Sequence, residues 1–193
     1  DTLGDRTHVT PADLGAKDGA AQLAKDAEAA LGQIDILINN AGLTRDGLAM
    51  RMKEEDWNRV LDVNLTASFQ LSQVMLRGMM KRRWGRIIAI TSIVGVTGNG
   101  GQTNYAASKA GLLQLTRWLS TTLAPDVRVN SISPGGVYRN QPTQFVERYE
   151  AKTPMRRMAI EEDFKGATIY LASDLSSYMT GQNLIVDGGW TVW

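Results

Sequence analysis

The chain has 193 residues, of which 43% are hydrophobic and 21% are charged. This length and composition suit one ordinary globular domain, so we expect residues 1–193 to form a single domain. The formal net charge is +1 with scattered lysines and arginines, which argues against a nucleic-acid partner or an anionic membrane surface. Because the chain has no cysteine and one histidine, His8, we expect neither disulfides nor a metal site.

The first ten residues, DTLGDRTHVT, lack the basic stretch and apolar core of a signal peptide. No apolar run approaches the length of a membrane span. The sequence therefore favours a cytoplasmic protein without a membrane partner.

Helical and strand patterns alternate along the chain. Apolar residues at helical spacing predict helices over residues 16–31, 54–81, 104–123 and 161–171. Aliphatic and β-branched runs predict buried strands over residues 34–38, 86–90, 127–132 and 184–186. The polar, proline-containing stretch 138–157 has no clear period, which is typical of a loop that could close over a site.

This alternation predicts an α/β fold with a doubly wound, mostly parallel, Rossmann-like sheet. Strands this apolar need helices on both faces, and right-handed crossovers supply them. Ligands of such sheets bind beyond the carboxyl ends of the strands. We therefore expect the loops after Ile38, Ile90 and Ile132 to line the site.

The sequence NNAG, residues 39–42, follows the strand that ends at Ile38. Two amides and a glycine allow a sharp turn and a close approach of the backbone to a ligand. An Asx turn at a strand end explains the same residues without any ligand.

Ser92, Tyr105 and Lys109 form a second pattern. Ser92 follows the strand RIIAI, while Tyr105 and Lys109 lie four residues apart on the helix that follows, and so share one face. A nearby ammonium lowers the pKa of a phenol, so Tyr105 could exchange a proton with a carbonyl oxygen that Ser92 holds. Each residue alone has an ordinary structural explanation, but the combination favours catalysis.

Asn64 interrupts the apolar helical segment RVLDVNL. A buried amide needs hydrogen-bond partners. Its side chain could order water near Lys109 or bond to the backbone as a core amide, and the residues themselves favour neither interpretation.

Together, NNAG, Asn64, Ser92, YAASK and SPGG resemble, in order and spacing, the short-chain dehydrogenase/reductase family over nearly the whole chain. The resemblance implies a catalytic tetrad of Asn64, Ser92, Tyr105 and Lys109. In that tetrad Lys109 also touches the nicotinamide ribose, and Asn64 holds a proton-relay water.

The same resemblance implies cofactor contacts along the chain. It assigns the adenine to Asp13 and Leu14, and further cofactor contacts to Asn39, Ala41, Gly42, Tyr105, Lys109, Pro134, Gly135 and Val137. The family's threonine after the Pro–Gly pair is missing from PGGVYRNQPT, and Asn140 or Thr143 could replace it.

The central block resembles the 3-oxoacyl-[acyl-carrier-protein] reductases of the family. This implies reduction by NADPH of a carbonyl carried on an acyl carrier protein, within a homotetramer or dimer. The tail resembles members that act on sugar precursors, so an NAD(P)-dependent sugar or alcohol dehydrogenase is the alternative. A catalytically silent fragment or interaction subunit is the alternative of another class.

Family members open with a strand, a glycine-rich turn and a helix, and none of these precedes Asp1 in the sequence given. Residues 1–6 resemble the end of the second helix and residues 7–10 the third strand. The fold is thus expected to lack its first two strands, which leaves the strand at 34–38 with a free apolar edge. The charged side chain that distinguishes NADP from NAD lies in the part that is expected to be missing. The resemblance therefore implies NADP as the cofactor, with NAD as the alternative.

Overall fold

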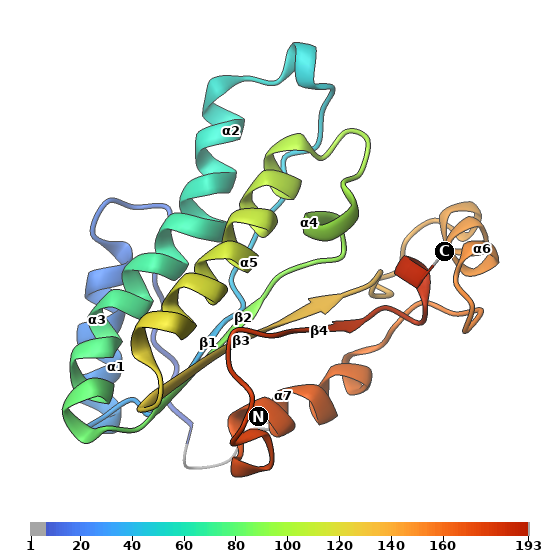
Figure 1. Cartoon of the computed structure of the whole chain (residues 1–193). Coiled ribbons are helices and arrows are strands. Elements are labelled where there is room, and N and C mark those ends of the chain that lie inside the picture. The colour runs from blue at the N-terminus through green and yellow to red at the C-terminus, as the bar shows by residue number, and fades with distance from the viewer. Residues whose placement is uncertain (1–6, 193) are drawn as a thin grey trace.

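The computed structural model describes residues 7–192, which form an α/β fold around a parallel sheet (Figure 1). The sheet has four strands in the order β1-β2-β3-β4, and each neighbouring pair is parallel. The strands are β1 (Ile36–Asn39), β2 (Gly85–Ile90), β3 (Val127–Pro134) and β4 (Asn183–Val186). The four predicted strands are confirmed, with bounds that differ by at most two residues.

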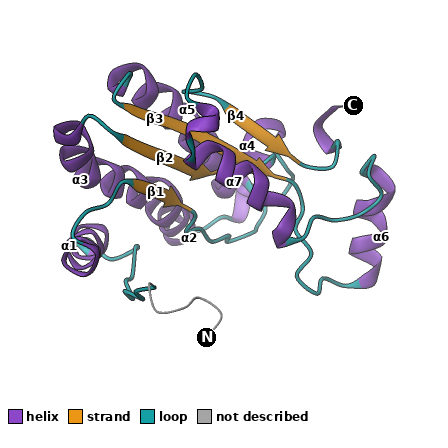
Figure 2. Ribbon diagram, turned by 90° about the horizontal axis from the view of Figure 1, so that it is seen from below, coloured by secondary structure: helices purple, strands orange, loops and turns teal. Residues whose placement is uncertain are grey.

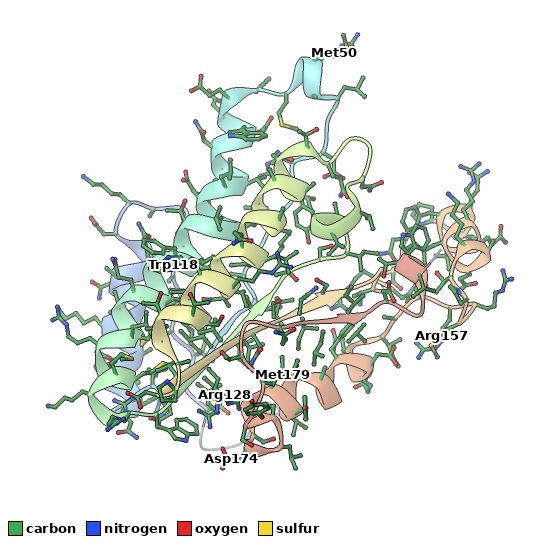
Figure 3. All side chains as sticks on the ribbon, viewed as in Figure 1. Met50, Trp118, Arg128, Arg157, Asp174 and Met179 are labelled. Atoms are coloured by element: carbon green, nitrogen blue, oxygen red, sulfur yellow. The ribbon has the colours of Figure 1, made fainter. Side chains whose placement is uncertain are left out.

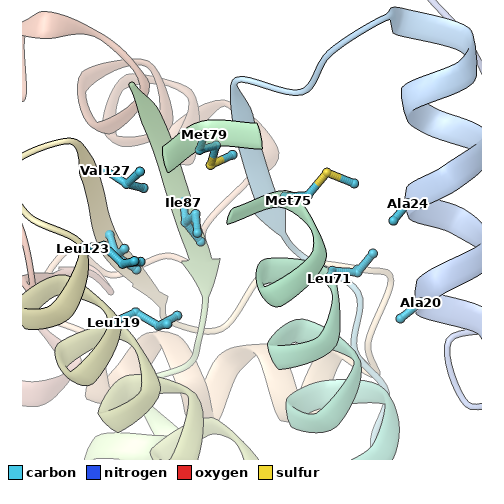
Figure 4. Packing of buried hydrophobic residues seen from close by; sticks show 10 residues of the cluster. Ala20, Ala24, Leu71, Met75, Met79, Ile87, Leu119, Leu123 and Val127 are labelled. Carbon is cyan, nitrogen blue, oxygen red and sulfur yellow. The ribbon is translucent and has the colours of Figure 1, made fainter. Parts of the chain in front are cut away.

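Helices cover both faces of the sheet, as Figure 2 shows. The central strands β2 and β3 are buried along nearly their whole length. On one face α3 (Ala67–Arg82) and α5 (Thr103–Leu123) cover them, and α1 (Gly19–Leu31) packs against α3; the shared cluster is drawn in Figure 4. On the other face α7 (Lys165–Ala172) packs over Ile88 and Ile132. The doubly wound arrangement predicted from the sequence is therefore present.

The predicted long helix over 54–81 is continuous but not uniform. It comprises α2 (Glu54–Leu61), a π-helical turn η2 (Asp62–Thr66) and α3. A π turn adds a residue to one turn of helix and often marks a functional position. Asn64 lies inside this turn.

The remaining elements are short. They are η1 (Ala49–Arg51), α4 (Val94–Thr97), α6 (Thr143–Lys152), η3 (Glu161–Phe164), η4 (Asp174–Ser176) and η5 (Trp190–Val192). The prediction of irregular structure over 138–157 is wrong for α6, whose aromatic residues Phe145 and Tyr149 lie one turn apart. In Figure 1, α6 lies beside the C-terminal end of the described chain, beyond the carboxyl ends of β3 and β4.

Two further expectations need correction. Residues 7–10 form no strand, and Val9 is 83% exposed. Among the described residues this segment has no neighbouring strand to pair with, since the sheet consists of β1 to β4 alone. Helix α1 begins at Gly19 rather than at residue 16, since residues 14–18 form turns. The predicted helix end at residues 1–6 lies outside the described residues.

The free edge of β1 is apolar, as expected. Ile36 is 40% exposed and Ile38 is 43% exposed, although both stand in a strand that pairs with the buried β2. A strand edge of this kind presents unpaired backbone groups and can associate with another strand.

Buried arginines fasten α7 to the end of the sheet that lies opposite the carboxyl ends. The Arg128 guanidinium donates to the carbonyl of Met179 at 3.0 Å (both labelled in Figure 3) and to that of Ser173 at 2.9 Å. Arg86 pairs with Asp174 at 3.0 Å. Charged donors satisfy these carbonyls at the end of α7 and in the loop behind it. The arginines therefore serve packing rather than an anionic partner.

Candidate active site

A cavity of about 1140 Å³ opens at the carboxyl ends of the strands. The loops after β1, β2 and β3 and the start of α5 all contribute to it, in agreement with the expectation for parallel sheets. Its walls include the predicted residues Gly42, Ser92, Tyr105, Lys109, Pro134, Gly135 and Val137. Segments more than ninety residues apart in the sequence thus meet in one place.

Tyr105 stands in the first turn of α5 and faces Ser92, which follows β2. Burial raises the pKa of Tyr105 above its ordinary value, and a hydrogen bond with the Ser92 side chain opposes the rise. The sequence-based expectation of a lowered pKa is therefore wrong. Desolvation of the phenolate outweighs the hydrogen bond here.

Lys109 lies one helical turn after Tyr105 and is only 3% exposed. Its Nζ donates to the backbone oxygen of Ile90 at 2.7 Å and lies 5.6 Å from the centre of the Tyr105 ring. Burial lowers the pKa of Lys109 to about 8. An ammonium has three N–H donors, so Lys109 keeps donor capacity for a ligand in the cavity that it lines.

Asn64 is fully buried and does not line the cavity. Its amide donates to the Leu43 oxygen at 3.0 Å and accepts from the Leu43 nitrogen at 2.8 Å. It also donates to Ser108 Oγ at 3.0 Å, which ties the loop after β1 to α5. Of the two interpretations of Asn64, the contacts favour the core amide bonded to backbone, which shapes the cavity wall at Leu43.

Three of the other predicted cofactor residues lie around a neighbouring cavity of about 280 Å³ beside the free edge of β1. They are Leu14, Asn39 and Ala41, while Asn40 lines both cavities. The buried Asn39 amide also donates to Ser72 Oγ at 3.1 Å on α3, so this residue has a packing role as well. Asp13 lines neither cavity and pairs with Arg59 at 3.0 Å.

Sequence reasoning missed the aromatic wall opposite Tyr105. Tyr149 of α6 stacks on Trp190, with 4.4 Å between the ring centres and 12° between the planes. Both residues line the large cavity, as does Gln141, whereas Asn140 and Thr143 do not. The spacing of Phe145 and Tyr149 by four residues was the available signal. Trp190 therefore packs against α6 of its own chain.

The cavity suits the nicotinamide half of a dinucleotide. Drug-sized ligands occupy cavities of about 300–1,000 Å³, so this one can hold a nicotinamide riboside together with a substrate. A Cβ built on Gly42 would lie 3.4 Å from Lys109 Nζ and 3.4 Å from Asn64 Oδ1. The glycine therefore leaves space beside the Lys109 ammonium that a side chain would fill. Donors for ribose hydroxyls are thus available at Lys109.

The part of the chain that the structure describes contains no group of three or more histidine, cysteine, aspartate or glutamate side chains that could hold a metal ion. Across residues 7–192, no helix is both long enough and apolar enough to cross a bilayer.

Known proteins are similar to this chain over most of its length. Residues 1–191 match the family described as Enoyl-(Acyl carrier protein) reductase. Nodulation protein G of Rhizobium sp. (strain N33) is 45% identical over 192 residues, which cover 97% of this chain and 78% of that protein. Nodulation protein G of Rhizobium meliloti (strain 1021) is 42% identical with the same coverage.

The 3-oxoacyl-[acyl-carrier-protein] reductase FabG of Escherichia coli (strain K12) is 43% identical over 166 residues, which cover 83% of this chain and 68% of that enzyme. The parallel sheet and the meeting of Ser92, Tyr105 and Lys109 in one cavity accord with these matches. The chain belongs to the short-chain dehydrogenase/reductase family, whose members are NAD(P)-dependent oxidoreductases acting on CH–OH and C=O groups.

Proposed function

We propose that this protein reduces the ketone of a 3-oxoacyl thioester carried on an acyl carrier protein, with NADPH as the reductant. The observation that carries the proposal is the convergence of Ser92, Tyr105 and Lys109 on one cavity. The name of the Escherichia coli relative supplies the substrate class. A cytoplasmic location accompanies this proposal.

Each of the three side chains has a role in the proposal. The Ser92 hydroxyl donates a hydrogen bond to the ketone oxygen, and Tyr105 gives that oxygen its proton. The raised pKa of Tyr105 keeps the phenol protonated near neutral pH, which is the form that a proton donor needs. Lys109 stabilises the phenolate that remains. When bound, NADPH supplies the hydride.

The cofactor would extend across both cavities. We assign the nicotinamide half to Tyr105, Lys109, Gly42 and the loop with Pro134, Gly135 and Val137, which line the large cavity. The adenosine half would lie toward Leu14, Asn39 and Ala41, which line the neighbouring one, with Asp13 next to Leu14. Asn64 would act by fixing the Leu43 loop beside Lys109.

We further propose that residues 1–193 form one domain of a homo-oligomer, a tetramer or a dimer. Large apolar side chains on the outer faces of α3 and α5 support this proposal. Trp118 is 56% exposed (Figure 3), and Phe69 and Val74 are partly exposed. Apolar side chains of this kind are typical of subunit contacts. Light scattering on the purified chain measures the assembly.

The purified full chain is assayed by NADPH oxidation with an acetoacetyl thioester, offered free and on an acyl carrier protein. Tyr105→Phe should lower kcat/KM by about 10²–10⁴, the usual contribution of a positioned proton donor. Ser92→Ala should lower it by about 10²–10³, the usual loss when a hydrogen-bond donor to the reacting oxygen is removed. Tyr178→Phe, a change at a fully exposed tyrosine, is the matched control. Comparison of NADPH with NADH decides the cofactor.

Two other functions are outcomes of the same assay. A sugar or alcohol dehydrogenase is favoured by the stacked Tyr149 and Trp190 in the cavity wall, because aromatic faces pack well against sugar rings. Turnover of a sugar or polyol without reduction of any 3-oxoacyl thioester would select it. Cofactor binding without turnover of either class would select a catalytically silent interaction subunit.

A further inference from the structure

A third cavity, of about 130 Å³, lies directly behind the aromatic wall of the large one. It is enclosed by the end of β4 and by residues 155–163. Three residues line both cavities, namely Gly135, Gly136 and Tyr149. Since the two glycines have no side chain, the Tyr149 ring is the one side chain among the described residues that separates the two cavities. We call this ring the partition.

The Tyr149 ring is held in place from several directions. Its hydroxyl accepts a hydrogen bond from the Gly136 nitrogen at 2.5 Å, and its face stacks on Trp190. A Cβ built on Gly136 would lie 2.6 Å from the Tyr149 ring, so the ring packs directly on the glycine backbone. The partition is therefore a fixed wall and not a freely rotating side chain.

The small cavity offers mainly hydrocarbon contacts to a ligand. Met155, Ala159 and Val186 contribute apolar surface to it. Its charged groups already have partners within the chain, because Arg157 pairs with Asp163 at 2.6 Å and Asp187 accepts from the Gly189 and Thr191 nitrogens. An alkyl chain could occupy this volume without leaving a buried charge unpaired.

We propose that Tyr149 determines substrate specificity by closing the large cavity against the small one, so that it limits the length of the acyl chain beyond the reacting carbonyl. This inference rests on the proposed function, since it takes the substrate to carry an alkyl chain. With Tyr149 in place the enzyme prefers short chains. A smaller residue at this position joins the two cavities and admits several further methylene groups.

The test compares 3-oxobutyryl and 3-oxodecanoyl thioesters as substrates of the full chain. Tyr149→Ala should raise the ratio of kcat/KM for the long chain to that for the short chain by about tenfold or more, which is the gain expected from burying two further methylenes. Tyr149→Phe keeps the ring and should keep the wild-type ratio. Tyr178→Ala removes an exposed tyrosine as the matched control.

A second measurement separates this inference from the proposed function. Calorimetry with the saturated decanoyl thioester, which has no ketone to reduce, reports the joined cavity without turnover. Tighter binding by Tyr149→Ala than by wild type supports the wall even if no variant reduces a 3-oxoacyl thioester. Equal binding by the two, or an unchanged chain-length ratio, overturns it. If Tyr149→Ala does not fold, Tyr149→Leu serves, because it shortens the side chain and keeps an apolar contact with Trp190.

Discussion

Lys109 carries a positive charge in a place where the fold offers it little compensation. The side chain is almost completely buried, and among the described residues the one hydrogen-bond acceptor of its Nζ is the neutral carbonyl of Ile90. Burial lowers the pKa of Lys109 from 10.5 to about 8. A lowering of this size corresponds to about 3 kcal/mol by which the charged form is disfavoured in the folded state.

Lys109→Met should therefore stabilise the fold at pH 7 while abolishing catalysis. Methionine has a similar length and buries no charge, so the free energy of unfolding should rise by up to about 3 kcal/mol. Denaturation in urea or guanidinium chloride measures this quantity directly. Lys165→Met is the matched control, because Lys165 is largely exposed in a surface ion pair with Glu162, and such pairs contribute little.

The stability difference between wild type and Lys109→Met should shrink as the pH rises. Below about pH 8, Lys109 is protonated in both states and the full penalty is present. Between about pH 8 and 10.5 the folded state loses the proton first, so the unfolded state binds more protons and wild-type stability rises relative to the variant. Wild type and Lys109→Met with equal stability at pH 7, or a difference that stays constant up to pH 10.5, would refute the reasoning.

Two other changes test the walls of the site. Asn64→Ala removes three hydrogen bonds, two of them to the Leu43 backbone, and should lower the free energy of unfolding by about 2–3 kcal/mol in denaturant titration; an unchanged value would mean that the Leu43 loop is held by other contacts. Gly136→Ala forces the Tyr149 ring aside and should shift chain-length preference as Tyr149→Ala does. Gly166→Ala in α7, where an added Cβ meets nothing, is its control and should stabilise the helix by about 0.5–1 kcal/mol without altering that preference.

The elements that could be predicted from the sequence are those whose pattern reflects local packing. Strands β2 and β3 are buried on both faces, so apart from Arg86, Arg128 and Asn130 their residues are apolar or small, and this pattern is visible in the sequence. Helix α6 was missed because none of its residues is buried and its pattern is therefore weak. A strand was wrongly predicted over residues 7–10, since a strand needs a neighbour and the pattern alone does not supply one.

The site divides in the same way. The spacing of Tyr105 and Lys109 places both on one face of a helix, because a helix returns to the same face after about four residues. The order of strand and helix places Ser92 at the same end of the sheet. The sequence by itself therefore determined the fold class and the placement of the three proposed reacting groups at one end of the sheet.

Only the tertiary structure decided the state and surroundings of those groups. Desolvation depends on every segment packed around a side chain, so the raised pKa of Tyr105 and the lowered pKa of Lys109 follow from the assembled fold. The backbone contacts of Asn64 depend on a loop twenty-one residues away. Tyr149 became part of the cavity because its ring packs on the backbone of Gly135 and Gly136 and stacks on Trp190, forty-one residues further along the chain, and no local spacing encodes these contacts.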